Sequence, residues 1–197
     1  MIIEIEGVDG IGKTTQCKLL KNWFGERNKP SIIVKDLEST HLGREMKAIF
    51  TSDVPRTKEV ELFGFLCCKA HLFAEIITPN VNHGTHVICD RGIGSFLSYF
   101  EVEGFDPNFL KEILAKVLPE KFTPVTFLLF CDIRETLRRN VIKPSHSKFD
   151  NMGSEFFEKQ QNVYKRLAKT NDWKIIDASD SIENVHALIT LSIENLQ

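Results

Sequence analysis

The feature that most limits how this chain can fold is a short glycine-rich segment near its start. The segment matches the pattern G-x-x-x-x-G-K-[ST] and reads Gly7-Val8-Asp9-Gly10-Ile11-Gly12-Lys13-Thr14. An apolar, strand-like run precedes it, and a helical pattern begins at Lys13. A loop of this kind between a strand and a helix is typical of proteins that bind the phosphates of a nucleoside triphosphate.

Each residue type in this loop has a chemical role. Gly10 and Gly12 allow the backbone to curl, so that successive N–H groups point at one phosphate. Lys13 supplies a point charge to the transferred phosphate, and Thr14 supplies a hydroxyl ligand for Mg²⁺. The predicted ATP-binding residues are Gly7, Val8, Asp9, Gly10, Ile11, Gly12, Lys13, Thr14 and Thr15.

Length and charge narrow the class of protein. The chain has 197 residues, which favours a single domain over residues 1–197. Lys and Arg number 25 and Asp and Glu number 27, so the net charge is −2 and no broad nucleic-acid-binding face is expected. The longest strongly apolar run, residues 125–131, is too short to cross a membrane, so no membrane partner is expected.

Two further observations favour a cytoplasmic protein. Glu4 and Glu6 lie where a secretory signal peptide needs positive charge and a long apolar run. The five cysteines are an odd number without a C-x-x-C pair, and Cys67 and Cys68 are adjacent. This spacing fits neither a zinc site nor a redox motif. We therefore expect reduced thiols buried in the core.

Short apolar runs alternate with longer helical patterns along the chain. The expected strands are 2–6, 31–35, 85–90, 124–131 and 173–177. The expected helices are 13–24, 42–50, 57–81, 106–118, 134–141, 154–168 and 181–196. Several strands are apolar throughout, as strands covered on both faces are. This predicts an α/β fold with a doubly wound, five-stranded parallel sheet, in which ligands bind beyond the carboxyl ends of the strands.

A carboxylate and a cation follow the third expected strand. Asp90 stands where a Walker B aspartate holds Mg²⁺, and a helix cap or turn is the alternative role. Arg91 comes next, and a cation at the mouth of the sheet suits a second phosphate-bearing substrate. Thr14 and Asp90 are therefore the predicted metal-binding residues.

Two other classes of phosphate-loop protein lack support in the sequence. A GTPase would carry an N-K-x-D motif that reads the base, whereas Asn28-Lys29 continues into Pro30-Ser31. A partition-type ATPase would have lysine where Val8 stands. These absences favour a small-molecule kinase.

Several motifs resemble those of the thymidylate (dTMP) kinase family, in the same order and over nearly the whole chain. Residues 6–16 resemble E-G-x-D-G-x-G-K-[ST]-T-Q, and residues 61–65 resemble the family's E-L-L-L-F helix. Residues 90–99 resemble D-R-Y-x-x-S-x-x-A-Y, with Ser95 and Tyr99 in place. The resemblance implies a P-loop nucleotide kinase fold with a mobile lid near residues 142–153.

The resemblance also implies roles for individual residues. Lys13, Asp9 and Arg91 would be catalytic. Asp9 would orient the acceptor nucleotide or an arginine near its phosphate, and Arg91 would clamp phosphate oxygens. Phe65 would stack on the thymine ring, and Tyr99 would lie beneath the deoxyribose. For both aromatic residues the alternative is an ordinary place in the core.

The full set of implied substrate-binding residues is Asp36, Arg44, Lys47, Phe65, Lys69, Arg91, Ser95 and Tyr99. The implied lid residues are Lys143, Lys148 and Asp150. Lys69 stands where the family has an arginine that bonds the base, and lysine lacks the planar fork of arginine. Gly10 stands where some members carry a catalytic arginine, and residues 142–150 contain none. Lys143, Lys148, Arg138 or Arg139 would then supply that charge.

The leading hypothesis is an ATP-dependent enzyme that phosphorylates dTMP, with ATP and dTMP as partners and Mg²⁺ as cofactor. Lys69 and Phe96, which replaces a small polar residue, motivate an alternative kinase with a different base preference. The arginine-free lid motivates a nucleotide-binding protein without turnover. Family members are usually homodimers, so the apolar stripe within residues 60–77 is either a dimer interface or the buried side of an ordinary helix.

Overall fold

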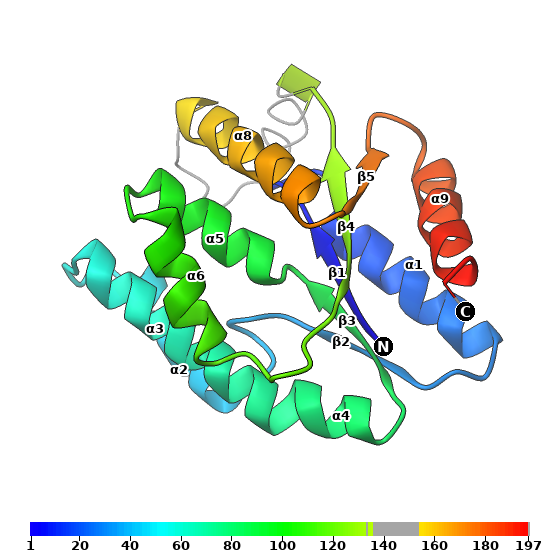
Figure 1. Ribbon diagram of the computed structural model, residues 1–197, viewed down its shortest axis with the longest axis horizontal. Helices are drawn as coiled ribbons and strands as arrows, with labels where there is room; N and C mark the ends of the chain where they lie inside the picture. The colour runs from blue at the N-terminus through cyan, green and yellow to red at the C-terminus, as the bar shows by residue number, and fades with distance from the viewer. Residues whose placement is uncertain (133, 136–153, 197) are drawn as a thin grey trace.

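The computed structural model describes residues 1–132, 134–135 and 154–196 and contains a five-stranded parallel sheet covered by helices (Figure 1). The strand order is β2-β3-β1-β4-β5. The strands are β1 (Ile2–Glu6), β2 (Ser31–Val34), β3 (His86–Asp90), β4 (Val125–Phe130) and β5 (Lys174–Asp177). The helices are α1 (Lys13–Glu26), α2 (His41–Thr51), α3 (Lys58–Leu72), the π-helical η1 (Phe73–Ile77), α4 (Thr78–Asn82), α5 (Ile93–Val102), α6 (Pro107–Ala115), α8 (Ser154–Thr170) and α9 (Ile182–Glu194). The predicted doubly wound α/β fold is confirmed.

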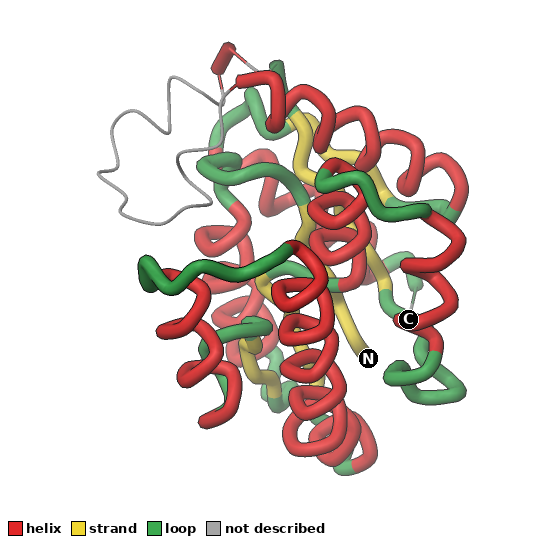
Figure 2. The backbone as a smooth tube through the Cα atoms, turned by 90° about the vertical axis from the view of Figure 1, so that its left-hand side faces the viewer, coloured by secondary structure: helices red, strands yellow, loops and turns green. Residues whose placement is uncertain are grey.

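Two groups of helices cover the sheet. The helices α1 and α9 pack together to the right of the sheet in Figure 1, whereas α3, α5, α6 and α8 lie to its left. Figure 2, which faces the left-hand side of Figure 1, shows this second group in front of the strands. Because β1 pairs with β3 on one side and β4 on the other, the loop that follows β1 leaves the middle of the sheet.

Side-chain oxygens begin several helices where the sequence supplies them. Thr40 accepts a hydrogen bond from the Gly43 N–H at 2.9 Å at the start of α2. Asp106 accepts hydrogen bonds from the N–H groups of Asn108 and Phe109, both at 2.9 Å, and Pro107 opens α6 as predicted. Such caps satisfy backbone donors that have no partner within the helix.

The helical segments differ from the predictions in three places. The predicted helix 57–81 is the succession α3, η1 and α4, and the predicted helix 106–118 ends at Ala115. The helix α5 was not predicted, because most of its side chains are buried and no polar stripe marks an outer face. The predicted lid, residues 142–153, and almost all of the predicted helix 134–141 lie outside the described residues.

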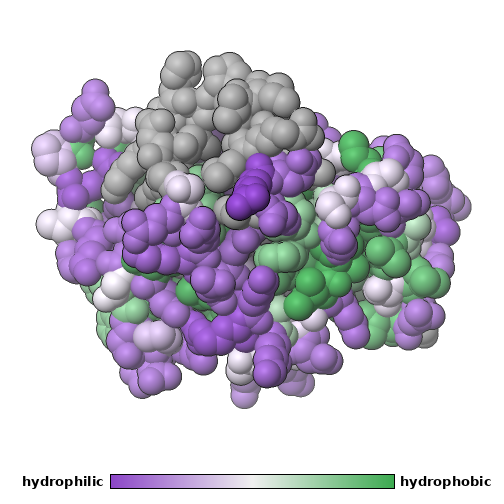
Figure 3. All heavy atoms as spheres, turned by 90° about the horizontal axis from the view of Figure 1, so that it is seen from above, coloured by the Kyte–Doolittle hydropathy of each residue, from purple (hydrophilic) through white to green (hydrophobic). Residues whose placement is uncertain are grey.

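The cysteines are divided between the core and the surface. The thiols of Cys17, Cys68, Cys89 and Cys131 are buried as predicted, but Cys67 is exposed, which corrects the expectation that all five lie in the core. Over the described part of the chain, no helix has both the length and the apolar character that a membrane crossing requires. In Figure 3, apolar side chains gather toward the side of α1 and α9, and hydrophilic residues cover most of the remaining described surface.

Candidate active site

The phosphate loop connects the carboxyl end of β1 to the first residue of α1. Gly10 and Gly12 have φ angles of 78° and 104°, in the left-handed region that glycine enters without strain. Lys13 is the first residue of α1, and its side chain folds back over the loop to donate a hydrogen bond from Nζ to the Val8 carbonyl at 2.8 Å. The loop therefore has the backbone shape that its sequence predicts, with its lysine inside the curve.

Three charged side chains converge beside this loop. Arg91 donates a hydrogen bond from Nη2 to Asp9 Oδ1, and Lys13 Nζ lies 3.7 Å from the same oxygen. Burial alone would raise the pKa of Asp9, but the charges of Arg91 and Lys13 outweigh it and lower the pKa to about 2. Burial, with the nearby charge of Arg91, lowers the pKa of Lys13 to about 8. The cluster thus carries net positive charge where a phosphate would enter.

Thr14 and Asp90, the predicted metal-binding residues, are in direct contact. The Thr14 hydroxyl donates to Asp90 Oδ2 at 2.6 Å, and Lys35 Nζ lies 3.3 Å from the same oxygen. Hydroxyl and carboxylate oxygens are the ligands that Mg²⁺ prefers, and this ion usually keeps several waters and binds substrate phosphates as well. Two protein oxygens at the mouth of the sheet therefore fit a magnesium ion that arrives with ATP.

The buried carboxylate of Glu6 binds the residues that follow Arg91. Glu6 is fully buried and accepts hydrogen bonds from the N–H groups of Gly92 and Ser95, both at 2.9 Å. The Ser95 hydroxyl donates to Glu6 at 2.6 Å and accepts from Arg91 Nη1 at 3.2 Å. Arg91 itself has φ 80°, which is uncommon for a residue other than glycine. Glu6 and Ser95 thus hold the start of α5 in place and present Arg91 to Asp9.

Phe65 and Tyr99, the aromatic residues predicted to contact the nucleoside, belong to one cluster of rings on α2, α3 and α5. Phe65 is half-buried and stacks on Phe50, with ring centroids 4.8 Å apart and planes 2° apart. The ring centroids of Tyr99 and Phe65 are 6.4 Å apart, and Phe100 packs edge-on against both rings. Tyr99 is 9% exposed, and its hydroxyl donates to Glu61 at 3.2 Å, which also fits the alternative of a core tyrosine. The four rings Phe50, Phe65, Tyr99 and Phe100 are called the aromatic cluster below.

Lys69 lies in a buried ion pair. Its ammonium donates to both carboxylate oxygens of Asp36, at 2.9 and 2.8 Å, and to the Gly92 carbonyl at 3.3 Å. Because an ammonium has three hydrogens, these contacts use every donor that Lys69 has. No donor of Lys69 is left for a base in this arrangement, whereas the planar fork of an arginine could reach Asp36 and a base together. The contact of Lys69 with the substrate stays a prediction.

The remaining predicted contacts lie on the surface. Arg44 donates to the Glu38 carbonyl at 3.0 Å, and Lys47 pairs with the Glu38 carboxylate at 2.6 Å. The side chains of Lys47 and Glu38 are each 46% exposed. The structure therefore places both cations on α2 but directs them toward the loop after β2. The lid candidates Lys143, Lys148 and Asp150 lie outside the described residues, as do Arg138 and Arg139.

Sequence reasoning missed several residues of this region. Lys35 was not predicted, although it directly follows β2, which pairs with the strand that ends in Asp90. Glu4 and Glu6 were not predicted as site residues, although Glu6 begins the family motif at residues 6–16. Their position on an apolar central strand was the available signal, because a carboxylate buried in a sheet needs several partners. Arg56 and Phe50 carried no motif that would have identified them.

Comparisons with known proteins agree with this geometry. A family model described as thymidylate kinase matches residues 5–189. A probable thymidylate kinase of Pyrococcus horikoshii is 31% identical, and the alignment covers 98% of this chain and 95% of that protein. The thymidylate kinase of Fervidobacterium nodosum is also 31% identical, over 94% of each chain.

The fold has a counterpart among solved structures. The crystal structure of thymidylate kinase from Ehrlichia chaffeensis superposes with a TM-score of 0.78, at 23% identity and over 98% of both chains. The structural similarity establishes the shared fold. The family model and the 31% identical relatives establish membership of the family. On these grounds the chain belongs to the thymidylate kinase family.

Proposed function

We propose that this protein transfers the γ-phosphoryl group of ATP to the 5′-phosphate of dTMP, giving ADP and dTDP. In the reaction an oxygen of the acceptor phosphate forms a bond to the γ-phosphorus as the bond to the oxygen bridging β- and γ-phosphates breaks. The observation that carries the proposal is the convergence of Lys13, Asp9 and Arg91 beside a complete phosphate loop in a member of this family.

The three charged residues have complementary roles in this proposal. Lys13 neutralises charge on the transferred group, because phosphoryl transfer is catalysed mainly by positioning and electrostatic stabilisation. Arg91 clamps oxygens of the two phosphates that meet. Asp9 holds Arg91 in place, since its carboxylate stays ionised down to a pH of about 2. Gly7, Val8, Gly10, Ile11, Gly12, Thr14 and Thr15 form the rest of the ATP-binding loop.

Magnesium is part of the proposal. Thr14 and Asp90 would hold the ion, whose chemical contribution is to neutralise phosphate charge. Lys35 would balance the charge of Asp90 in the absence of the ion, because its ammonium lies 3.3 Å from that carboxylate.

The acceptor would bind between the aromatic cluster and Arg91. Phe65 offers the thymine ring an aromatic face, and Tyr99 offers the sugar a flat, rigid surface. Ser95 supports Arg91 rather than touching the substrate. Asp36 and Lys69 form a wall of this region through their mutual ion pair.

We also propose that residues 1–197 form one domain and that the protein is a homodimer. Along α3 and the helical segments after it, Val60, Phe63, Cys67 and Ala74 are exposed, and Val60 and Phe63 are 52% and 54% exposed. Their spacing places them on one face. Sedimentation equilibrium would test the dimer, and a Phe63→Glu variant should shift the mass toward that of a monomer. Dimers in both proteins would reject this face as the interface.

A coupled assay tests the proposed activity. Formation of ADP by the purified protein would be followed with ATP, Mg²⁺ and, in turn, dTMP, dUMP, dCMP, dGMP, UMP and thymidine. A kcat/KM for dTMP well above the other values supports the proposal. If none of these acceptors supports ADP formation, although circular dichroism shows that the protein is folded, the result would favour a nucleotide-binding protein without catalysis.

A different base preference is the second candidate function. The observation that favours it is the complete engagement of the Lys69 ammonium by Asp36 and Gly92. A higher kcat/KM for another monophosphate or for thymidine in the same assay would favour it.

A further inference from the structure

One arginine secures the connection between α2 and α3. The Arg56 guanidinium donates from Nη1 to the carbonyls of Ser52 and Val54, at 3.2 and 3.0 Å, and from Nη2 to the carbonyl of Phe50. Its Nε forms an ion pair with Glu61 Oε1, 2.9 Å away, without donating a hydrogen bond, and the side chain is only 8% exposed. A buried guanidinium with four such contacts fixes the end of α2 against the first turns of α3.

Glu61 connects this arginine to the aromatic cluster. The Glu61 side chain is 1% exposed, so its charge depends on nearby partners. One carboxylate oxygen faces Arg56, and the other accepts the hydroxyl hydrogen of Tyr99 at 3.2 Å. Arg56 thereby holds Glu61 in the position from which Glu61 orients the Tyr99 ring.

A second connection runs through Phe50. Arg56 binds the Phe50 carbonyl, and its guanidinium carbon lies 5.8 Å from the centre of the Phe50 ring. Phe50 is fully buried and stacks on Phe65. Gly64 leaves room for this stack, because a Cβ there would lie 2.6 Å from the tip of the Phe50 ring, which would have to shift. Arg56 is thus connected to Tyr99 through Glu61 and to Phe65 through Phe50, the two rings that would form the nucleoside-binding surface.

We propose that Arg56 is a positioning residue for the acceptor nucleoside. Through Glu61 it sets the Tyr99 ring, and through Phe50 it sets the Phe65 ring, without touching the substrate itself. The inference rests on the proposed function, because it takes Phe65 and Tyr99 as the surface that receives dTMP. The planar fork is essential to it, since a lysine lacks the directed donors to bind three carbonyls while its charge stays beside the Glu61 carboxylate.

Calorimetric titration of dTMP and of ATP into variants tests this role. Arg56→Met should raise the Kd for dTMP by about tenfold to 100-fold, the loss that a small displacement of positioning groups produces. The Kd for ATP should change by less than about twofold, because Arg56 is remote from the phosphate loop in sequence and contacts. Arg56→Lys keeps the charge beside Glu61, so it should fold and show an intermediate rise for dTMP.

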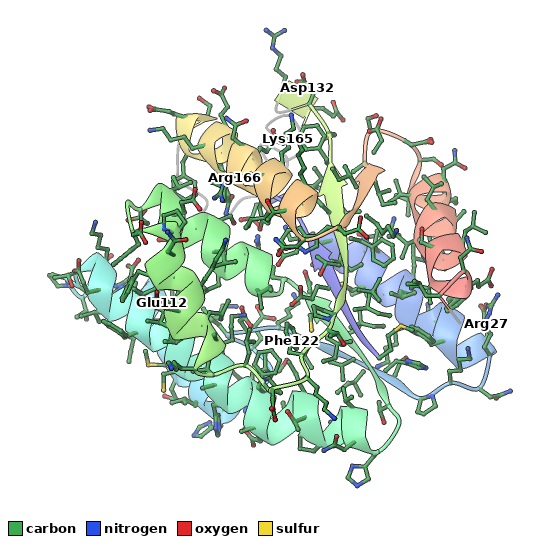
Figure 4. The ribbon with its side chains drawn as sticks, viewed as in Figure 1. Arg27, Glu112, Phe122, Asp132, Lys165 and Arg166 are labelled. Carbon is green, nitrogen blue, oxygen red and sulfur yellow. The ribbon has the colours of Figure 1, made fainter. Side chains whose placement is uncertain are left out.

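Arg27→Met is the matched control. Arg27 also joins a carboxylate, a backbone carbonyl and a ring, through Glu194, the Trp23 carbonyl and the Trp23 indole 4.1 Å away. It lies at the far end of α1, on the opposite side of the molecule from α3 (Figure 4). The control should bind dTMP and ATP as the wild type does, even if its melting temperature falls.

These measurements distinguish a failure of the positioning role of Arg56 from a failure of the proposed function. A wild type that binds no dTMP rejects the proposed function and this inference with it. A wild type that binds dTMP, with Arg56→Lys and Arg56→Met unchanged in Kd but less stable, rejects the positioning role alone. Equal losses for dTMP and ATP would likewise overturn it, because they would report general unfolding instead of a displaced aromatic surface.

Discussion

The phosphate loop follows the central strand β1, whereas the aromatic cluster lies on helices beside the sheet, and the two are built in different ways. The loop is made by consecutive residues between β1 and α1, and its geometry depends on backbone angles and on Lys13 folding back to Val8. The aromatic cluster takes side chains from three helices, and its rings are positioned through Arg56, in the connection between α2 and α3, and through Glu61 on α3.

This difference decides which site tolerates change. A short motif specifies a phosphate site because every donor nucleotide presents the same phosphates. A site assembled from three helices can be altered at many positions without loss of the fold. We therefore expect substitutions in the loop to affect every acceptor alike and substitutions around the aromatic cluster to affect acceptor binding alone.

The largest effect should come from Lys13→Met. Loss of the charge that neutralises the transferred phosphoryl group should lower kcat by about 10²–10³-fold, similar to the loss of one preorganised transition-state donor. Steady-state assays with saturating dTMP would measure it. Lys18→Met, an exposed lysine one turn further along α1, is the control. A Lys13 variant that keeps more than a tenth of wild-type kcat would contradict the role given to the loop.

The next effect should be a loss of stability in Lys69→Met. The substitution leaves the Asp36 carboxylate without its buried partner, which costs about 3–5 kcal/mol in the free energy of unfolding. Urea denaturation would measure it. The double variant Lys69→Met/Asp36→Leu should recover much of the loss, because no charge is then left unpaired. Equal stabilities for the single and double variants would show that the ion pair does not act as a unit.

A smaller, pH-dependent effect is expected for Glu4→Gln. Burial and the charge of Glu6 raise the pKa of Glu4 from 4.5 to about 7, while the Lys69 charge and hydrogen bonds from Ile93 and Thr126 oppose the rise. The folded protein therefore prefers the protonated carboxyl. Its contribution to stability is complete below pH 4.5 and is lost as the pH rises through about 7.

Denaturation at several pH values would test this expectation. Relative to Glu4→Gln, the wild type should lose about 3 kcal/mol of unfolding free energy between pH 4.5 and pH 8. Glu112→Gln, an exposed glutamate on α6 (Figure 4), should show no such change. Parallel pH profiles for the wild type and Glu4→Gln would refute the raised pKa.

The smallest effect should belong to Lys47→Ala. Its pair with Glu38 is exposed, and such pairs contribute less than about 1 kcal/mol to stability. The KM for dTMP should stay within about twofold of the wild-type value, because Lys47 points at Glu38 rather than at Arg91. A tenfold rise in KM, measured with saturating ATP, would restore Lys47 as a contact of the acceptor phosphate.

The phosphate loop could be predicted from the sequence far better than the contacts around the aromatic cluster. Lys13, Thr14 and Asp90 could be placed from the sequence, because a strand–loop–helix unit and the ends of neighbouring parallel strands fix their positions. The helix α5 was missed because it is buried on most sides and lacks an amphipathic pattern. The Lys69–Asp36 and Arg56–Glu61–Tyr99 contacts could not be predicted, since they depend on how α2 and α3 pack against the sheet.

The most direct test of the account is calorimetric titration of dTMP and ATP into the wild type and Phe65→Ala. The aromatic face that Phe65 offers to the base should be worth about 1–3 kcal/mol of binding free energy, as base stacking on aromatic side chains usually is. We predict that Phe65→Ala weakens dTMP binding by this amount and leaves ATP binding unchanged. Equal dTMP affinities for the two proteins would contradict the claim that the aromatic cluster receives the acceptor.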